Sequence, residues 1–243
     1  FREASAKGRA LEKEALGLAR QGGVRIIGPN CFGIYNPRNR LTLLPGVDLS
    51  TTPGDIAFLS QSGGFSMHVA RLCQSLGLHF NALVSYGNGA DIDESDLLRY
   101  FARDPRTRVI GAYVEGVQDG RAFLDALREA TAEKPVVLWK VGKAATAQKA
   151  VMSHTGSLAG SAEIWEAALR QTRVIQASGI DEVCDVFLAL RHLGWRPGRR
   201  LLLSGGGGGL GADAADLAGP AGLDIPALNE GTARKLTAIL SRA

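Results

Sequence analysis

The alternation of short apolar runs with helical segments most constrains how this 243-residue chain can fold. The apolar runs predict strands at 55–59, 80–85, 109–114, 135–141 and 174–175. Apolar residues at helical spacing predict helices at 65–76, 94–102, 120–131, 162–172 and 180–193. Strands and helices in this order form a parallel, doubly wound α/β sheet. In such a sheet, the loops at the carboxyl ends of the strands form the binding site.

The segments on either side of this region predict pieces of two other units. Residues 1–20 predict a helix and 24–27 a short strand, followed by a turn and a loop that runs to Pro53 and Gly54. After a linker at 195–198, residues 200–204 predict a strand that enters a glycine-rich run. The chain opens in a helix with no strand before it, so we expect it to be a fragment of a larger protein.

Composition narrows the class of protein. The net charge of +4 comes from 28 basic and 24 acidic residues without a long basic run, which disfavours a nucleic-acid-binding surface. Cys31, Cys73 and Cys184 are odd in number and lack C-x-x-C spacing, so we predict neither a disulfide framework nor a zinc site. No apolar run reaches the roughly 18 residues of a membrane span. We expect a cytoplasmic protein with no metal site of its own.

Polar residues follow the predicted strands at one edge of the sheet. Ser62 follows the first strand, Asn88 the second and Glu115 the third, and His154 lies beyond the fourth. The helix start at 62–64 offers unpaired N–H groups and a helix dipole, which together favour a phosphate. A carboxylate that ends a buried strand costs free energy unless it meets a partner. His154 is the candidate partner of Glu115.

His154 stands among small residues just before a predicted helix. There its imidazole would lie near unpaired backbone N–H groups, which is the setting that a phosphorylated histidine requires. A second interpretation stays open, in which His154 is a loop histidine bonded to a backbone carbonyl and Glu115 simply reaches solvent. We interpret His68, His79 and His192 as structural or surface residues.

Two motifs suggest other classes of enzyme. Gly206-x-Gly208-x-x-Gly211 follows a predicted strand and matches the dinucleotide fingerprint, but a run of five glycines satisfies that pattern easily. Ser60-x-Ser62-x-Gly64 is similar to the nucleophile elbow of serine hydrolases but lacks its first glycine. The second motif fits a phosphate cradle better, because N–H groups and a hydroxyl converge at a helix start.

Five motifs, taken in order, give the chain a resemblance to a known family. The motifs are Gly28-Pro29-Asn30-Cys31-Phe32-Gly33, Ser60-Gln61-Ser62-Gly63-Gly64, Tyr86-Gly87-Asn88-Gly89-Ala90-Asp91, Tyr113-Val114-Glu115-Gly116 and Ser153-His154-Thr155-Gly156-Ser157. They resemble those of NDP-forming acyl-CoA synthetases, which are the ADP-forming acetate–CoA ligases related to the α subunit of succinyl-CoA synthetase.

The resemblance implies three parts in the chain. These are the end of a Rossmann CoA-binding domain at about 1–50, a flavodoxin-like ligase domain at about 51–195 and the start of a second flavodoxin-like CoA-ligase domain at about 196–243. It also implies a reaction in which an acid, CoA and a nucleoside triphosphate give acyl-CoA, nucleoside diphosphate and phosphate. This reaction runs through an acyl phosphate and a phosphohistidine.

The resemblance further implies roles for single residues. His154 matches the histidine that is phosphorylated, and Glu115 matches the carboxylate that orients its imidazole. The other implied residues bind phosphate (Ser62, Gly63, Gly64 and Gly156), CoA (Gly28, Pro29, Asn30 and Cys31) and the acyl group (Asn88 and Asp91).

The implied cofactors and partners extend beyond this sequence. CoA is expected to bind, whereas ATP and Mg²⁺ are expected on an ATP-grasp subunit or domain that the sequence lacks, so the chain alone should not complete a turnover. We expect an oligomer that acts on a small carboxylic acid and phosphate, with no nucleic-acid or membrane partner. Two other classes stay open: an acyl-CoA-sensing region of a protein acetyltransferase, against which His154 argues, and an NAD- or flavin-binding enzyme on a similar fold.

Overall fold

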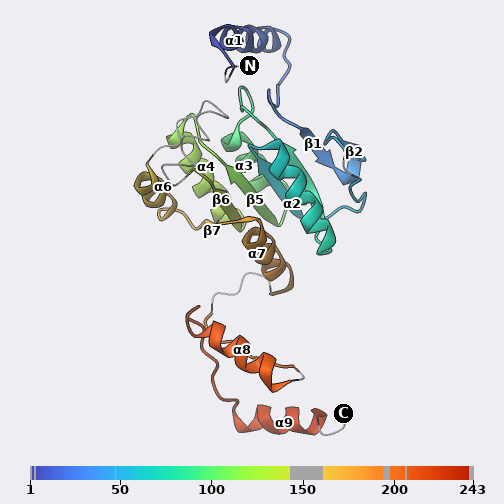
Figure 1. The fold of residues 1–243 in the computed structure, drawn as a ribbon, viewed down its shortest axis with the longest axis vertical. Coiled ribbons are helices and arrows are strands. Elements are labelled where there is room, and N and C mark those ends of the chain that lie inside the picture. The colour runs from blue at the N-terminus through green and yellow to red at the C-terminus, as the bar shows by residue number, and fades with distance from the viewer. Residues whose placement is uncertain are drawn as a thin grey trace. The chain divides into compact units, whose positions relative to one another are not determined.

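The computed structural model describes residues 2, 4–46, 48–142, 161–193, 198–205 and 207–240. The chain divides into two compact units, Phe1–Gly194 and Trp195–Ala243. The first unit contains a seven-stranded sheet with helices on both faces (Figure 1). Before the sheet comes α1 (Ala6–Gln21), which begins where the Ser5 hydroxyl oxygen accepts a hydrogen bond from the Gly8 N–H at 3.0 Å.

Five strands of this sheet run parallel to one another. They are β3 (Ile56–Ser60), β4 (Phe80–Ser85), β5 (Val109–Val114), β6 (Val136–Lys140) and β7 (Ile175–Ala177). Their spatial order is β4-β3-β5-β6-β7, which is the flavodoxin-like order. The predicted flavodoxin-like, doubly wound α/β fold is therefore confirmed.

Two short strands extend the sheet beyond β4 and make it mixed. β1 (Gly33–Asn36) runs antiparallel to β4, and β2 (Leu41–Thr42) runs antiparallel to β1. The 3₁₀ turn η1 (Pro37–Asn39) joins them. The sequence predicted a loop here, because the partner of β1 lies about fifty residues further along the chain and leaves no local pattern.

The predicted strand at 24–27 does not form. Of these four residues, all described, Ile27 alone pairs in the manner of a strand, through an isolated bridge to Ile92. Arg25 instead extends toward Asp91, whose carboxylate oxygen accepts hydrogen bonds from Arg25 Nε at 2.9 Å and from the Ile26 N–H at 2.8 Å. The apolar pattern was too short to distinguish a strand from an extended segment held by one side chain.

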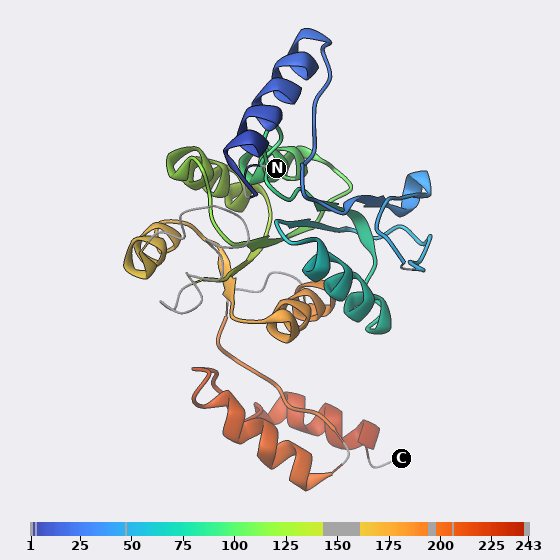
Figure 2. The same cartoon turned by 45° about the horizontal axis from the view of Figure 1, so that its top comes forward.

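Helices cover both faces of the sheet (Figure 2). α2 (Gly63–Ser75) and α7 (Ile180–Leu193) bury one set of side chains, and α3 (Glu94–Arg103), α4 (Gly120–Glu133) and α6 (Ala162–Leu169) bury the other. Successive residues of β3 alternate between the two cores, and all five are buried. Burial on both faces explains why its sequence reads as a continuous apolar run.

Gly111 of β5 allows two aromatic rings to meet on the sheet. A Cβ at this position would stand 2.5 Å from atoms of both Phe58 and Phe187, whose rings pack edge to face at 6.4 Å. We expect Gly111→Ala to lower the free energy of unfolding by about 1–3 kcal/mol, because the rings must shift in a packed core. Urea denaturation measures this loss. Gly120→Ala is the matched control, since nothing lies within 4 Å of its Cβ, and an equal loss there would contradict the packing argument.

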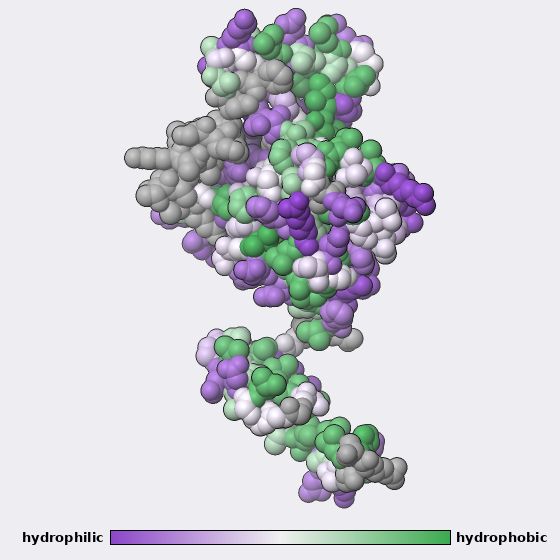
Figure 3. Space-filling model, turned by 45° about the vertical axis from the view of Figure 1, so that its right-hand side comes forward, coloured by the Kyte–Doolittle hydropathy of each residue, from purple (hydrophilic) through white to green (hydrophobic). Residues whose placement is uncertain are grey.

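The second unit contains α8 (Gly208–Ala218) and α9 (Glu230–Leu240). The strand predicted at 200–204 is absent from this described segment, where Arg200 makes an isolated bridge to Asp224. Figure 3 shows apolar surface over this unit. The most exposed apolar side chains there are Leu202, Leu210, Leu217, Ile239 and Leu240, each between 59% and 77% exposed.

Candidate functional site

The strand order reverses between β3 and β5, so the chain leaves these neighbouring strands in opposite directions. Ligands of open α/β sheets bind in the crevice outside such a reversal. Gln61 bridges the two strand ends here. Its side-chain oxygen Oε1 accepts hydrogen bonds from the N–H groups of Glu115, at 2.7 Å, and Gly116, at 3.1 Å. The loops that carry Ser62 and Glu115 are thereby joined.

The start of α2 forms one side of this reversal. Ser62 caps the helix, with its Oγ accepting from the Phe65 N–H at 3.4 Å. Gly63 and Gly64 are the first two residues of the helix, and a Cβ at position 63 would stand 2.6 Å from the ring of Phe32. The structure thus gathers Ser62, Gly63 and Gly64 at one helix start, where N–H groups and the helix dipole attract an anion.

Glu115 forms the other side, directly after β5. It is 5% exposed, and its backbone oxygen accepts a hydrogen bond from Lys140 Nζ at 2.8 Å. Burial, together with the nearby Glu115 carboxylate, raises the pKa of the Tyr113 hydroxyl, so this phenol stays protonated near neutral pH. A buried carboxylate at this position can orient an imidazole by accepting its N–H.

The turn at 28–33 and the loop at 86–91 lie side by side next to this site. The Asn88 N–H donates to the Pro29 carbonyl at 2.9 Å, and the Ala90 N–H donates to the Gly28 carbonyl at 2.9 Å. Gly87 permits this approach, because its φ is +57° and a Cβ there would stand 2.2 Å from the Asn30 carbonyl oxygen. The two motifs therefore form one surface, although Pro29 and Gly87 are 58 positions apart in the chain.

Side-chain bonds fix several residues that we predicted to bind CoA or the acyl group. The Cys31 thiol donates to the Ile27 carbonyl at 3.6 Å, and burial raises the pKa of this thiol, so it stays protonated. Asn88 is buried and donates through Nδ2 to Glu12 at 3.2 Å. The Asp91 carboxylate bonds Arg25, whose neighbouring cation lowers the pKa of that carboxyl. Asp91 thus joins two loops, and its role in acyl binding stays a prediction.

Glu94 is a buried carboxyl group at the start of α3, behind this surface. It is 4% exposed, and burial raises its pKa from 4.5 to about 7, with the Asp93 carboxylate adding to the effect and Arg2 opposing it. Burial and the charge of Glu94 also raise the pKa of Tyr86, which is fully buried. The folded protein therefore holds a proton on Glu94 over a pH range where the unfolded chain releases it.

We expect this proton to make stability fall as pH rises from about 4.5 to about 7, by about 2–3 kcal/mol. Glu94→Gln should remove that dependence, since the amide carries no charge to bury. The free energy of unfolding of the variant, relative to that of the native chain, should therefore be higher at pH 8 than at pH 5. Urea unfolding at the two pH values measures the difference. Glu129→Gln, on an exposed helix face, is the control. If the stability of the Glu94 variant changes with pH in the same way as that of the native chain, the assignment is wrong.

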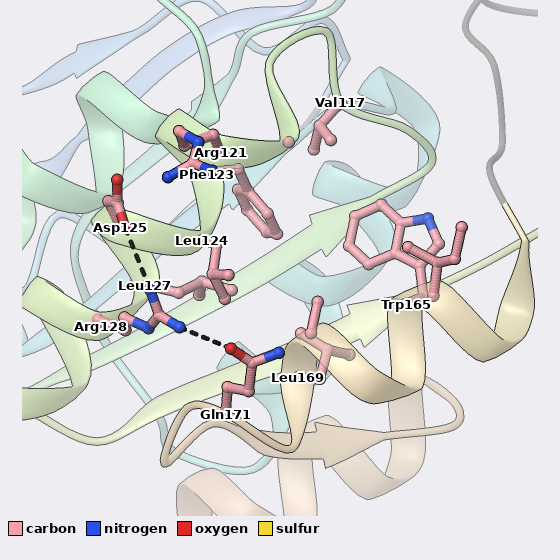
Figure 4. Close-up of a pocket in the computed structure, with 13 residues that line it drawn as sticks. Val117, Arg121, Phe123, Leu124, Asp125, Leu127, Arg128, Trp165, Leu169 and Gln171 are labelled. Carbon is pink, nitrogen blue, oxygen red and sulfur yellow. Dashed lines mark hydrogen bonds and ion pairs between the residues drawn. The ribbon is translucent and has the colours of Figure 1, made fainter.

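A separate groove of about 540 Å³ lies between α4 and α6 (Figure 4). Arg128 bonds Asp125 at 3.3 Å and Gln171 at 2.7 Å along one side of it. The rings of Phe123 and Trp165 meet edge to face at 5.6 Å on the other. The Trp165 ring centroid also lies 4.7 Å from Lys140 Nζ, so this residue connects the groove with the end of β6.

Two predicted site residues, His154 and Gly156, lie outside the described residues. Within the described ranges, none of the helices is long and apolar enough to cross a membrane. In those same ranges, no three or more His, Cys, Asp and Glu side chains group together as a candidate metal site. Gln61 and Lys140 were not predicted as site residues. A lysine at the end of an otherwise apolar strand was the signal that could have identified Lys140.

Comparisons with known proteins identify the family of this chain. A family model described as succinyl-CoA ligase like flavodoxin domain matches residues 53–190. The chain is 42% identical to acetate–CoA ligase (ADP-forming) I of Archaeoglobus fulgidus, over 99% of the chain and 35% of that protein. It is 39% identical to the α subunit of acetate–CoA ligase (ADP-forming) I of Pyrococcus furiosus, over 93% of the chain and 48% of that subunit.

A solved structure has a similar fold. It is the dinucleotide-forming acetyl-coenzyme A synthetase 1 of Ca. Korarchaeum cryptofilum in complex with phosphate and ADP, with a TM-score of 0.82 and 34% identity over 95% of this chain and 49% of that one. The chain thus spans between about a third and a half of the length of these relatives. We conclude that the chain belongs to the ADP-forming acyl-CoA synthetase family and that residues 53–190 are its succinyl-CoA-ligase-like flavodoxin domain.

Proposed function

We propose that this chain carries the phosphoryl-transfer part of an acid–CoA ligase that forms ADP, with His154 as the residue that becomes phosphorylated. One observation supports this proposal above all others. The start of α2 and the buried Glu115 lie on two sides of the β3–β5 reversal, joined by Gln61. This arrangement offers an anion site and an imidazole-orienting carboxylate together.

The residues take the following roles in the proposal. In the half-reaction with acyl phosphate, the imidazole of His154 attacks the phosphorus, the bond to the acyl oxygen breaks, and the carboxylate leaves. In the ligase direction the same step runs in reverse, and the carboxylate of the acid attacks the phosphorus of phosphohistidine. Glu115 accepts the N–H of the other ring nitrogen and stabilises the charge that forms. Ser62, Gly63, Gly64 and Gly156 hold the transferred phosphoryl group, which fits the free N–H groups at the start of α2.

In our proposal, the CoA and acyl groups bind on the surface formed by the turn at 28–33 and the loop at 86–91. We assign the CoA thiol to the turn formed by Gly28, Pro29, Asn30 and Cys31, and the acyl group to the vicinity of Asn88. The forward reaction then makes acyl-CoA from a carboxylic acid, CoA and a nucleoside triphosphate. The Korarchaeum relative was solved with phosphate and ADP, which agrees with a phosphoryl carrier of this kind.

The remaining parts of the enzyme follow from this assignment. We propose that an ATP-grasp subunit or domain binds ATP and Mg²⁺ and passes the terminal phosphoryl group to His154 in the ligase direction, as part of an oligomer in the cytoplasm. The three parts at about 1–50, 51–195 and 196–243 remain our domain proposal. The name of the Pyrococcus relative, an α subunit, supports a division of the enzyme between chains.

Mass spectrometry of the chain after incubation with acetyl phosphate tests the proposal. We expect an acid-labile phosphate on the peptide that contains His154, because this half-reaction needs no nucleotide. The same phosphate should appear with Mg-ATP once an ATP-grasp partner is present, and acid plus CoA should discharge it. If His154 stays unmodified under both conditions while acyl-CoA binds, the chain is a sensor of acyl-CoA and the ligase proposal is wrong.

A further inference from the structure

The backbone of Glu115 is held from both sides by buried side chains of neighbouring strands. Gln61, just after β3, accepts hydrogen bonds from the N–H groups of Glu115 and Gly116 at 2.7 and 3.1 Å. Lys140, the last residue of β6, donates from Nζ to the Glu115 carbonyl oxygen at 2.8 Å. Gln61 is 6% exposed and Lys140 is 4% exposed. The peptide groups before and after one carboxylate are therefore both fixed.

The position of Lys140 is costly for a residue with no function. Moving an ammonium group out of water costs free energy unless several partners replace its hydration. Here Nζ also bonds the Val141 carbonyl and lies 4.7 Å from the Trp165 ring centroid, which favours a cation. The β5–β6 ladder already joins these two strands without it, as Val114 pairs with Lys140 in register. The Lys140 ammonium therefore adds a hydrogen bond to Glu115, the residue that directly follows β5.

Fixing both peptide groups of a residue fixes the direction of its side chain. With its N–H and its carbonyl oxygen both bonded, Glu115 has little freedom in φ and ψ, so its Cα–Cβ bond points one way. A displacement of about 1 Å in a catalytic group can cost about 100-fold in rate. The two neighbours can therefore affect the chemistry through the direction of the Glu115 side chain.

We propose that Gln61 and Lys140 are positioning residues, a clamp that fixes the direction of the Glu115 carboxylate. This inference rests on the proposed function of Glu115. It adds two residues to the reaction, and each acts through hydrogen bonds to the peptide groups on either side of the Glu115 side chain.

A double-mutant cycle separates this role from a merely structural one. We expect Lys140→Met to slow the phosphorylation of the chain by acetyl phosphate about 100-fold, and to cause no further loss when Glu115→Gln is already present. Lys134→Met is the matched control, because Lys134 Nζ also donates to two backbone carbonyls, those of Phe101 and Asp104, near the end of α3. It should leave the rate unchanged. Losses that multiply in the double variant overturn the proposal.

Amide hydrogen exchange tests the clamp without any assay of activity. In Lys140→Met, exchange of the Glu115 and Gly116 amides should accelerate by at least about tenfold, while amides of the β3–β4 ladder keep their protection. Gln61→Met should have the same effect on the same two amides. Unchanged protection in both variants overturns the clamp. Faster exchange together with a normal rate in Glu115→Gln upholds the clamp and shows instead that the proposed function of Glu115 is wrong.

Discussion

A chain with asparagine in place of His154 is expected to take up no phosphate from acetyl phosphate. The amide nitrogen of asparagine is not a nucleophile, so no covalent phosphoryl intermediate can form at that position. The loss should therefore be complete within detection, which is the largest effect that we expect from any single change. Mass spectrometry of the peptide that contains position 154 measures it, and the midpoint of thermal unfolding shows whether the fold is intact.

Two other histidines serve as controls for this result. His68 lies exposed on α2 and His192 lies exposed near the end of α7, so His68→Asn and His192→Asn should leave phosphorylation at the native level. Phosphate that is still present in His154→Asn, or phosphate found on His68 or His192 of the native chain, would exclude His154 as the carrier.

Glu115→Gln is expected to slow phosphorylation by about 100-fold or more without loss of stability. Glutamine keeps the size of the side chain but removes the negative charge, so it no longer stabilises the imidazolium-like charge or fixes the ring tautomer. The carboxylate is 5% exposed, and replacing a buried charge by a neutral amide does not by itself destabilise the fold. Single-turnover rates with acetyl phosphate and urea unfolding measure the two quantities separately.

The pattern of the two measurements decides the role of Glu115. Glu133→Gln, at the exposed end of α4, is the control for a change of one charge and should alter neither quantity. If Glu115→Gln loses stability and rate together, the carboxylate holds the fold and its effect on phosphorylation is indirect. A normal rate would remove Glu115 from the mechanism.

The parallel sheet could be read from the sequence because its information is local. Strands at Phe80–Ser85 and Val109–Val114 have the predicted bounds, since each is an apolar run buried on both faces and ended by a turn. The antiparallel β1 could not be read, because its pairing with β4 depends on residues far along the chain. The strand predicted at 24–27 is absent for a related reason, because Arg25 Nε and the Ile26 N–H both donate to the distant Asp91 carboxylate.

The candidate site was predictable to the same extent. Ser62 and Glu115 follow neighbouring strands, and the carboxyl ends of parallel strands meet at one edge, so their proximity followed from topology. The bonds that Gln61 and Lys140 make to the Glu115 peptide groups did not follow, because these partners are backbone atoms. Any residue supplies a backbone N–H and carbonyl, so such a bond leaves no pattern of residue types.

The contact at Gly111 restricts how the core can change during evolution. A methyl group at this position collides with Phe58 and Phe187 at once, each at 2.5 Å, so exchanging one ring for a smaller side chain relieves only one of the two contacts. Position 111 therefore depends on two positions far apart in the sequence, one on β3 and one on α7. In descendants of this protein, alanine at 111 should be tolerated best where both aromatic positions have become smaller.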